Sequence, residues 1–152
     1  MASNRTVAIK GDPIRKESQA AAAITPGQLI ELASATTVQR HSTAGGPCSP
    51  MFALEDDHQG REIADNYLAD TKCTYGVFPP GAEVNALLAD GENAAVGDWL
   101  ESNGSGDLQV AIIDSIGVGG GLGVVGQAME AVDLSDSSGG DPATRRIKIA
   151  VR

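Results

Sequence analysis

The sequence predicts a mainly β protein, a small antiparallel β-sandwich or barrel-like domain with an extended N-terminal arm and long loops. From Ile24 onward, short apolar or alternating runs are separated by turn residues at intervals of roughly eight to twelve positions. Turn formers are abundant, with 19 glycines and 7 prolines among 152 residues. The alanine run 20–23 is too short to form a stable helix by itself.

Each predicted strand is a half-buried run bounded by turn residues. In the run 72–78, Cys73, Tyr75 and Val77 alternate with polar or small residues, and the sequence PPG then ends the run. The predicted strands are 28–32, 36–41, 50–55, 72–78, 83–88, 96–102, 108–113, 124–134 and 145–152.

The last predicted strand has two different faces. Three apolar residues alternate with a mostly basic set, which places them on opposite sides of the strand. The apolar residues are Ile147, Ile149 and Val151, and the other set is Arg146, Lys148 and Ala150.

The chain has the length of one domain. Residues 1–23 have a polar, locally basic start and no periodic apolar face, so we expect an extended arm. Residues 24–152 form the predicted β-rich domain. Within it, the acidic segment 55–70 and the turn-rich segment 135–142 do not fit strands and are predicted to be surface loops.

The predicted core is light. Hydrophobic residues make up 41% of the chain, but many of them are alanine, and aromatic residues make up only 3%. Small side chains contribute little transfer free energy when buried, because that energy scales with the apolar area removed from water. We therefore expect a homo-oligomer, whose subunits stabilise one another.

Charge is distributed unevenly along the chain. Residues 41–141 carry 17 acidic side chains against two basic ones, a net of −15, whereas residues 1–40 sum to +2 and residues 142–152 to +4. An acidic body is repelled by phosphate, so we expect no direct binding to nucleic acid. An equally simple reading is that acidic loops keep the protein in solution.

No segment of the sequence approaches the length of apolar chain that crosses a bilayer, and the N-terminus lacks the apolar stretch of a signal peptide. We expect synthesis in a cytoplasm and no contact with a membrane. Cys48 and Cys73 lie far apart and belong to no CxxC motif, so they are predicted to be thiols rather than a disulfide or a zinc site.

A glycine-rich stretch, 117–126, contains the spacing of a nucleotide-binding GxGxxG motif at Gly121, Gly123 and Gly126. That motif requires a strand before it and a helix after it. Here a short run and a turn-rich acidic segment follow instead. The stretch is therefore predicted to be a loop between strands, and no nucleotide cofactor is expected.

The residue types that can bind metals or act in catalysis do not form a recognisable site in the sequence. His41 and His58 lack the spacing that places two metal ligands on one helix face, so no metal is expected. A histidine could serve as base for Cys48 or Cys73, but no flanking signature supports such a pair. The acidic residues fall in predicted loops rather than in buried pairs. We expect no enzymatic activity and no cofactor.

Several runs together resemble a known family. They are ITPGQLIEL (24–32), PMFALEDDHQG (50–60), PPGAEVNALLADGENAAVGDWLESNGSG (79–106) and GQAMEAVDLSDSSGGDPATRRIKIAVR (126–152). The most specific phrases are LLADGENAAVGDWL (87–100) and AVDLSDSSGGDPATRRIKI (131–149). The chain from Ile24 to Arg152 resembles the small capsid decoration, or cement, proteins of tailed bacteriophages.

This resemblance implies a structural virion protein without catalytic residues. Such a protein binds the outer surface of the expanded capsid, stabilises the head, and often forms a trimer. The implied partner is the major capsid protein, and the implied location is the outside of the virion.

We predict that the basic ends face the capsid, because their charge contrasts with the acidic body. Trp99 is predicted to lie in the core or at a subunit interface. The candidate capsid- or subunit-contact residues are Arg5, Lys10, Arg15, Lys16, Trp99, Arg145, Arg146, Lys148 and Arg152.

The alternative function is a β-sandwich binding module that is displayed on a virion and recognises a carbohydrate or a receptor. Sites of this kind usually present exposed aromatic side chains. The sequence offers one tryptophan, two tyrosines and two phenylalanines for this role.

Overall fold

The computed structural model describes residues 5–112, 123–135 and 145–152. Strands dominate these residues, which confirms the predicted mainly β class. One short 3-10 helix, η1 (Asp57–Gln59), is the helical element among them. No helix in the described part of the chain is long and apolar enough to cross a membrane. The strands are β1 (Ala8–Lys10), β2 (Ile14–Ala20), β3 (Ile30–Leu32), β4 (Thr37–Arg40), β5 (Met51–Ala53), β6 (Lys72–Val77), β7 (Glu83–Leu87), β8 (Asn93–Ala94), β9 (Trp99–Ser102), β10 (Leu108–Val110), β11 (Val124–Ala128), β12 (Val132–Asp133) and β13 (Arg146–Val151).

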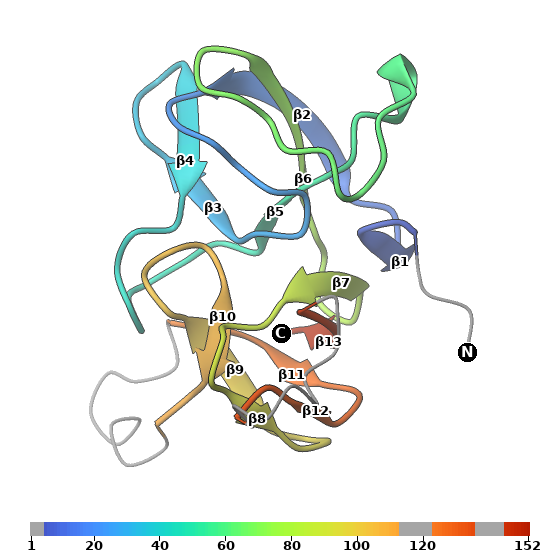
Figure 1. Ribbon diagram of the computed structural model, residues 1–152, viewed down its shortest axis with the longest axis vertical. Helices are drawn as coiled ribbons and strands as arrows, with labels where there is room; N and C mark the ends of the chain where they lie inside the picture. Colours follow the sequence, from blue (N-terminus) through green and yellow to red (C-terminus); the bar gives the residue numbers. More distant parts are fainter. Residues whose placement is uncertain (1–4, 113–122, 136–144) are drawn as a thin grey trace.

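Three sheets make up the fold. A five-stranded sheet with the order β3-β4-β2-β6-β5 occupies the upper half of the molecule in Figure 1, and a six-stranded sheet with the order β1-β7-β13-β11-β9-β10 occupies the lower half. Strands β12 and β8 form a small ribbon beside the lower sheet. Strand pairs in these sheets are antiparallel, except that β2 runs parallel to β4. None of the three sheets closes into a barrel.

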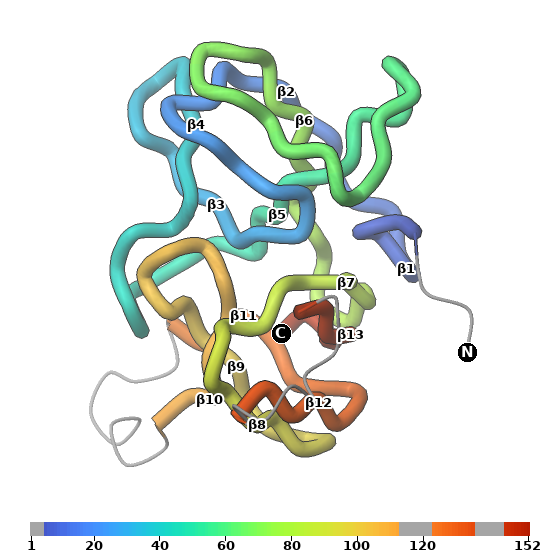
Figure 2. The backbone as a smooth tube through the Cα atoms, viewed as in Figure 1, coloured from blue at the N-terminus to red at the C-terminus, as the bar shows by residue number. Residues whose placement is uncertain are grey.

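The chain path explains the two halves. Residues from β2 to β6 build the five-stranded sheet, and residues from β7 onward build most of the six-stranded sheet (Figure 2). Strand β1 is the exception, because it pairs with β7 and so joins the sheet made by the C-terminal half of the chain. The first and last strands of the chain therefore belong to the same sheet.

The described part of the N-terminal segment, from Arg5 onward, is paired into the two larger sheets. β1 pairs with β7, and β2 pairs with β6 along almost its whole length, from Ile14 to Gln19. The boundary predicted at residue 23 thus does not separate this segment from the β domain. Sequence periodicity missed these strands because β2 exposes most of its side chains and is held through its backbone.

Strand β13 confirms the predicted alternation. Its apolar residues Ile147, Ile149 and Val151 are buried, whereas the residues between them are half-buried. The strand lies between β7 and β11, with Ile149 opposite Val84. Complete burial of one isoleucine side chain stabilises the fold by about 1.5–3 kcal/mol, so this strand contributes strongly to an otherwise light core.

The larger hydrophobic cluster is shared by the two halves. Leu29, Phe52 and Phe78 come from the five-stranded half and pack in one cluster with Ile147 and Ile149 of the six-stranded sheet. The rings of Phe52 and Phe78 meet edge to face, with their centroids 5.9 Å apart. A second, smaller cluster lies within the five-stranded sheet. The halves therefore fold as one unit.

The predicted loop 55–70 is largely exposed, but it has one buried anchor. Tyr67 pairs its backbone with that of Ile24, and its hydroxyl donates a 2.6 Å hydrogen bond to the carbonyl oxygen of Leu54. This bond joins the two ends of the loop. The predicted loop 135–142 lies outside the described residues apart from Ser135, and so does most of the glycine-rich stretch 117–126.

Two predicted strands differ from the structure in ways that have a local cause. The run 124–134 forms two strands, β11 and β12, which are separated by a turn at residues 129–131. The run 96–102 begins as a turn, because the side chain of Asp98 accepts a hydrogen bond from the backbone N–H of Ala95, and the strand starts only at Trp99. A local hydrogen bond between side chain and backbone competes here with strand propensity.

Arg146 links the two halves of the molecule. Its guanidinium donates hydrogen bonds to the carbonyl oxygen of Pro26 at 2.5 Å and to that of Ile63 at 3.0 Å, both in segments of the five-stranded half. Burial lowers the pKa of Arg146 to about 10, although Glu55 and Asp107 oppose the shift. At neutral pH the side chain therefore remains charged and serves as a half-buried donor of several hydrogen bonds.

Replacing Arg146 should destabilise the protein. The substitution Arg146→Met keeps most of the side-chain volume but leaves two carbonyl groups without their donor, so we expect the free energy of unfolding to fall by about 2–4 kcal/mol. The matched control is Arg15→Met at an exposed position of β2, which should change it by less than about 0.5 kcal/mol. Urea unfolding of both variants would measure the difference, and equal values would contradict the linking role of Arg146.

Candidate functional site

The basic residues predicted to contact a capsid do not form one patch. In the N-terminal segment, Arg5 is exposed, and Lys10 lies 3.5 Å from the carboxylate of Glu83 in an ion pair. Arg15 and Lys16 are exposed on β2. Since β1 and β2 belong to different sheets, these cations occupy two different parts of the molecule.

The basic residues near the C-terminus differ from one another in burial. Arg145 pairs with Asp107 at 3.2 Å, and Arg152 is exposed at the end of the chain. Lys148 is half-buried on β13. Arg146 was predicted to be a contact residue, but its guanidinium is committed to carbonyl groups inside the molecule, because the upper half covers this end of β13.

One row of residues crosses five strands of the six-stranded sheet. Residues paired directly across antiparallel strands point to the same face of the sheet. The strand register places Trp99 opposite Gln127, Gln127 opposite Ala150, Ala150 opposite Glu83 and Glu83 opposite Lys10. We call this side of the sheet the outer face. The row contains two predicted contact residues, Trp99 and Lys10, about 19 Å apart at a spacing of ~4.8 Å per strand, with the buried Glu83 of β7 between them.

Several exposed apolar residues lie near Trp99. Trp99 itself is 38% exposed, so its side chain is not fully buried in the core. The backbone of Ala111 donates a hydrogen bond to Trp99, and that of Gly97 donates one to Ala128, so the neighbours of these residues lie close to the tryptophan. Those neighbours include the exposed side chains of Val96, Ile112 and Met129. Exposed apolar groups that cluster in this way are typical of contact surfaces.

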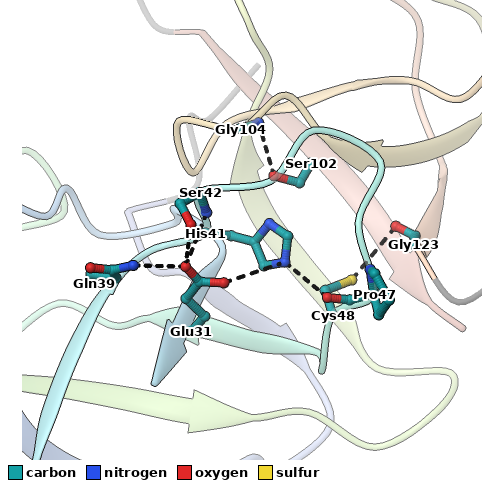
Figure 3. A network of polar contacts seen from close by, with 9 residues as sticks. All are labelled: Glu31, Gln39, His41, Ser42, Pro47, Cys48, Ser102, Gly104 and Gly123. Atoms are coloured by element: carbon teal, nitrogen blue, oxygen red, sulfur yellow. Dashed lines mark hydrogen bonds and ion pairs between the residues drawn. The ribbon is translucent and has the colours of Figure 1, made fainter. Parts of the chain in front are cut away.

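A pocket of about 340 Å³ lies at the open end of β3 and β4, away from the outer face. Its walls combine apolar side chains with a small polar network, which Figure 3 shows. The lining residues are Ile30, Glu31, Leu32, His41, Pro47, Cys48, Ser49 and Met51.

Glu31 is the centre of the polar network. One of its carboxylate oxygens accepts hydrogen bonds from the amide of Gln39 at 2.8 Å and from the hydroxyl and the backbone N–H of Ser42 at 2.5 and 3.2 Å. Burial alone would raise the pKa of Glu31, but these hydrogen bonds and the neighbouring His41 outweigh it and leave the pKa below 4.5. The carboxylate is therefore ionised at neutral pH and held in one position.

His41 is almost fully buried, with 2% of its surface exposed. Its Nε2 lies 3.0 Å from the carbonyl oxygen of Pro47 and 3.7 Å from the carboxylate of Glu31. Because both neighbours are acceptors, Nε2 is the N–H that donates a hydrogen bond to the carbonyl oxygen of Pro47. Nδ1 is buried and has no hydrogen-bond partner among the described residues. This geometry makes His41 a structural link to the 47–49 segment.

The structure brings His41 and Cys48 to the same pocket, a proximity that the sequence could not show. The arrangement does not activate the thiol. Cys48 donates a 3.6 Å hydrogen bond to the carbonyl oxygen of Gly123, and burial raises its pKa to about 11. Burial likewise raises the pKa of Cys73, to about 12. A reactive cysteine needs a lowered pKa, so both cysteines have the properties of structural thiols.

The described residues contain no group of three or more His, Cys, Asp or Glu side chains that could hold a metal ion. The candidate site that the structure supports best is a contact surface. That surface is the outer face, with Trp99 and its apolar neighbours at one end and Lys10 at the other.

Comparisons with known proteins found similarity among solved structures. No family model matches the sequence, and no curated protein matches it. Among solved structures, the chain is similar to the crystal structure of the head fiber gp8.5 N base of bacteriophage phi29, with a TM-score of 0.57. The alignment covers 91% of this chain and 93% of that chain at 10% sequence identity. At this identity the likeness shows a shared fold, and the resemblance to cement proteins stays a prediction.

The hydrogen bonds to Glu31 should make stability depend on pH. Because its pKa is lowered in the folded protein, the ionised carboxylate stabilises the fold above about pH 4.5, and this contribution is lost as the pH falls through the folded-state pKa. We expect Glu31→Gln to be less stable than the wild type at pH 7 and the difference to shrink below pH ~4. Urea unfolding across this range would measure it, with the exposed loop variant Glu62→Gln as the control.

Proposed function

We propose that this chain is a structural protein of a tailed-phage head that binds the outer surface of the expanded capsid and stabilises it as a cement protein. The observation that carries the proposal is the fold shared with a phage head fiber base over nine tenths of both chains. The sequence resemblance to capsid decoration proteins supports the same class. In this proposal the protein is not an enzyme and lies on the outside of the virion.

The proposed contact surface is the outer face of the six-stranded sheet. Interfaces are enriched in aromatic residues and methionine at their centre and tolerate charge at their rim. Trp99 and Met129 supply the apolar part, whereas Lys10 and Lys148 supply basic groups on an otherwise acidic protein. The major capsid protein is the proposed partner for this surface, and a homotrimer is the proposed form on the capsid.

Stabilisation of the expanded capsid would follow from the binding equilibrium of this protein. If the protein binds the expanded shell more tightly than the precursor shell, each occupied site stabilises the expanded state by RT ln(1 + [L]/Kd), about 2.7 kcal/mol at a hundredfold excess over Kd. The acidic net charge of −9 disfavours binding to the packaged nucleic acid and so favours the protein shell as the ligand.

A second candidate function is a β-sandwich module that is displayed on a virion and recognises a carbohydrate or a receptor. Its specific support is the exposure of Trp99, whose ring is flanked on the same face by Gln127 and Glu101. Aromatic rings beside polar groups are the usual platform for sugars. Binding of a soluble glycan that Trp99→Ala abolishes, without any binding to capsids, would favour this function.

Sedimentation with capsids tests the cement function. Purified protein should bind undecorated expanded capsids saturably, at a copy number related to the shell symmetry, and should bind unexpanded capsids at least tenfold more weakly, a difference of about 1.4 kcal/mol. The variant Trp99→Ala should lower occupancy of the expanded shell, because it removes the largest apolar group of the outer face.

The matched control is Leu68→Ala, which removes an exposed apolar side chain from the loop 55–70. It should bind like the wild type. Absence of binding to either shell would reject the cement function, and equal effects of the two substitutions would reject the outer face as the contact surface.

A further inference from the structure

Strand β2 has a free edge along most of its length. It pairs with β6 from Ile14 to Gln19, but with β4 only at Gln19 and Ala20. Among the described residues, no strand pairs with β2 beside residues 14–18 on the side away from β6. We call residues 14–18 the β2 edge. It belongs to the five-stranded sheet and is separate from the outer face.

The hydrogen-bond pattern identifies which backbone groups the β2 edge presents. Ala20 donates its N–H to Thr71 across the β6 side, whereas Gln19 donates its N–H to Thr36 on the β4 side. Successive residues of a strand point their backbone groups in opposite directions. The N–H and C=O groups of Arg15 and Glu17 therefore point away from β6, to the side where no strand is paired.

These groups are accessible. Each residue from Ile14 to Glu17 is exposed, and the side chain of Ile14 is 66% exposed. Four exposed residues in succession mean that both faces of the strand are open. An exposed edge of this kind is a template for pairing with another chain.

The β2 edge has a limited length. Pro13 precedes it and has no N–H to donate, and at its other end β4 begins at Thr37. A chain that pairs with the edge would therefore lie in line with β4, just before its first residue. Only a short extended segment fits between these two limits.

Charge determines which segment the edge would accept. Glu17 is paired with Lys72 at 3.1 Å, whereas Arg15 and Lys16 form no ion pair within the described part of the chain. A symmetric pair of β2 strands would place one residue opposite its own copy, for example Lys16 opposite Lys16, and opposed like charges destabilise strand pairing. An acidic strand would meet complementary charge instead.

We propose that the β2 edge binds a short extended acidic segment of another protein by strand addition. The segment would exchange backbone hydrogen bonds with Arg15 and Glu17, place carboxylates near Arg15 and Lys16, and cover the exposed side chain of Ile14. This site goes beyond the proposed function, since it uses a different sheet and does not require a capsid.

The first test uses a synthetic peptide of alternating threonine and glutamate with one valine, and a control peptide with lysine in place of glutamate. On adding the acidic peptide at saturation, amide hydrogen exchange at Arg15 and Glu17 should slow by about fivefold or more. Exchange at Lys16 should change little, because its N–H already bonds to β6. Equal slowing at all three amides, or no slowing at any, would overturn the proposal.

Two variants separate strand pairing from charge. Arg15→Pro removes the outward N–H without touching the ladder to β6, a position where proline is tolerated, whereas Arg15→Gln removes only the charge. Titration of the acidic peptide should show a loss of affinity of more than tenfold for Arg15→Pro and of about threefold for Arg15→Gln.

Equal losses for the two variants, or equal binding of the lysine control peptide, would contradict the proposal. Circular dichroism would establish that Arg15→Pro is folded, and the exchange experiment on the wild type tests the edge even where that variant does not fold. Self-association that Arg15→Pro abolishes would assign the edge to a second copy of the chain and overturn the acidic partner. None of these outcomes bears on capsid sedimentation, which tests the proposed function separately.

Discussion

The junction between the two sheets depends on Arg146. The shared core contains only two aromatic side chains, Phe52 and Phe78, beside aliphatic ones, and apolar packing alone is not directional. The guanidinium adds directional bonds, because it joins β13 to the backbone at Pro26 and Ile63. Around the same junction, Gly106 accepts a hydrogen bond from Leu29 and donates one to His41. Hydrogen bonds between backbone segments thus add to hydrophobic burial in holding the two sheets together.

The sequence predicted the fold class and the alternation of β13 because these depend on local pattern. Runs of period two and frequent turn residues mark strands wherever one face of a strand is buried. The same reasoning failed for β2, whose side chains are exposed on both faces and whose place in the sheet rests on backbone pairing with β6. Exposed strands of this kind carry no periodic signal.

The candidate site was predictable only in part. Composition and charge drew attention to Trp99 and Lys10, but their common face depends on the register of five strands from distant parts of the chain. For Arg146, the charge suggested a contact on the surface, whereas the structure shows hydrogen bonds from its guanidinium to carbonyl groups of the same chain. The proximity of His41 to Cys48 likewise follows from the turn between them and its contact with Gly123.

The bond between Tyr67 and Leu54 has a practical consequence for engineering. It closes the base of the loop that begins after Leu54, and Arg146 holds Ile63 within the loop, so an insertion that falls before Ile63 leaves both bonds in place. Closing a longer loop costs little additional entropy, and a side chain at Gly60 would meet no atom within 4 Å. Foreign peptides inserted at this glycine would be presented on a fixed stem, which makes the protein a scaffold for peptide display.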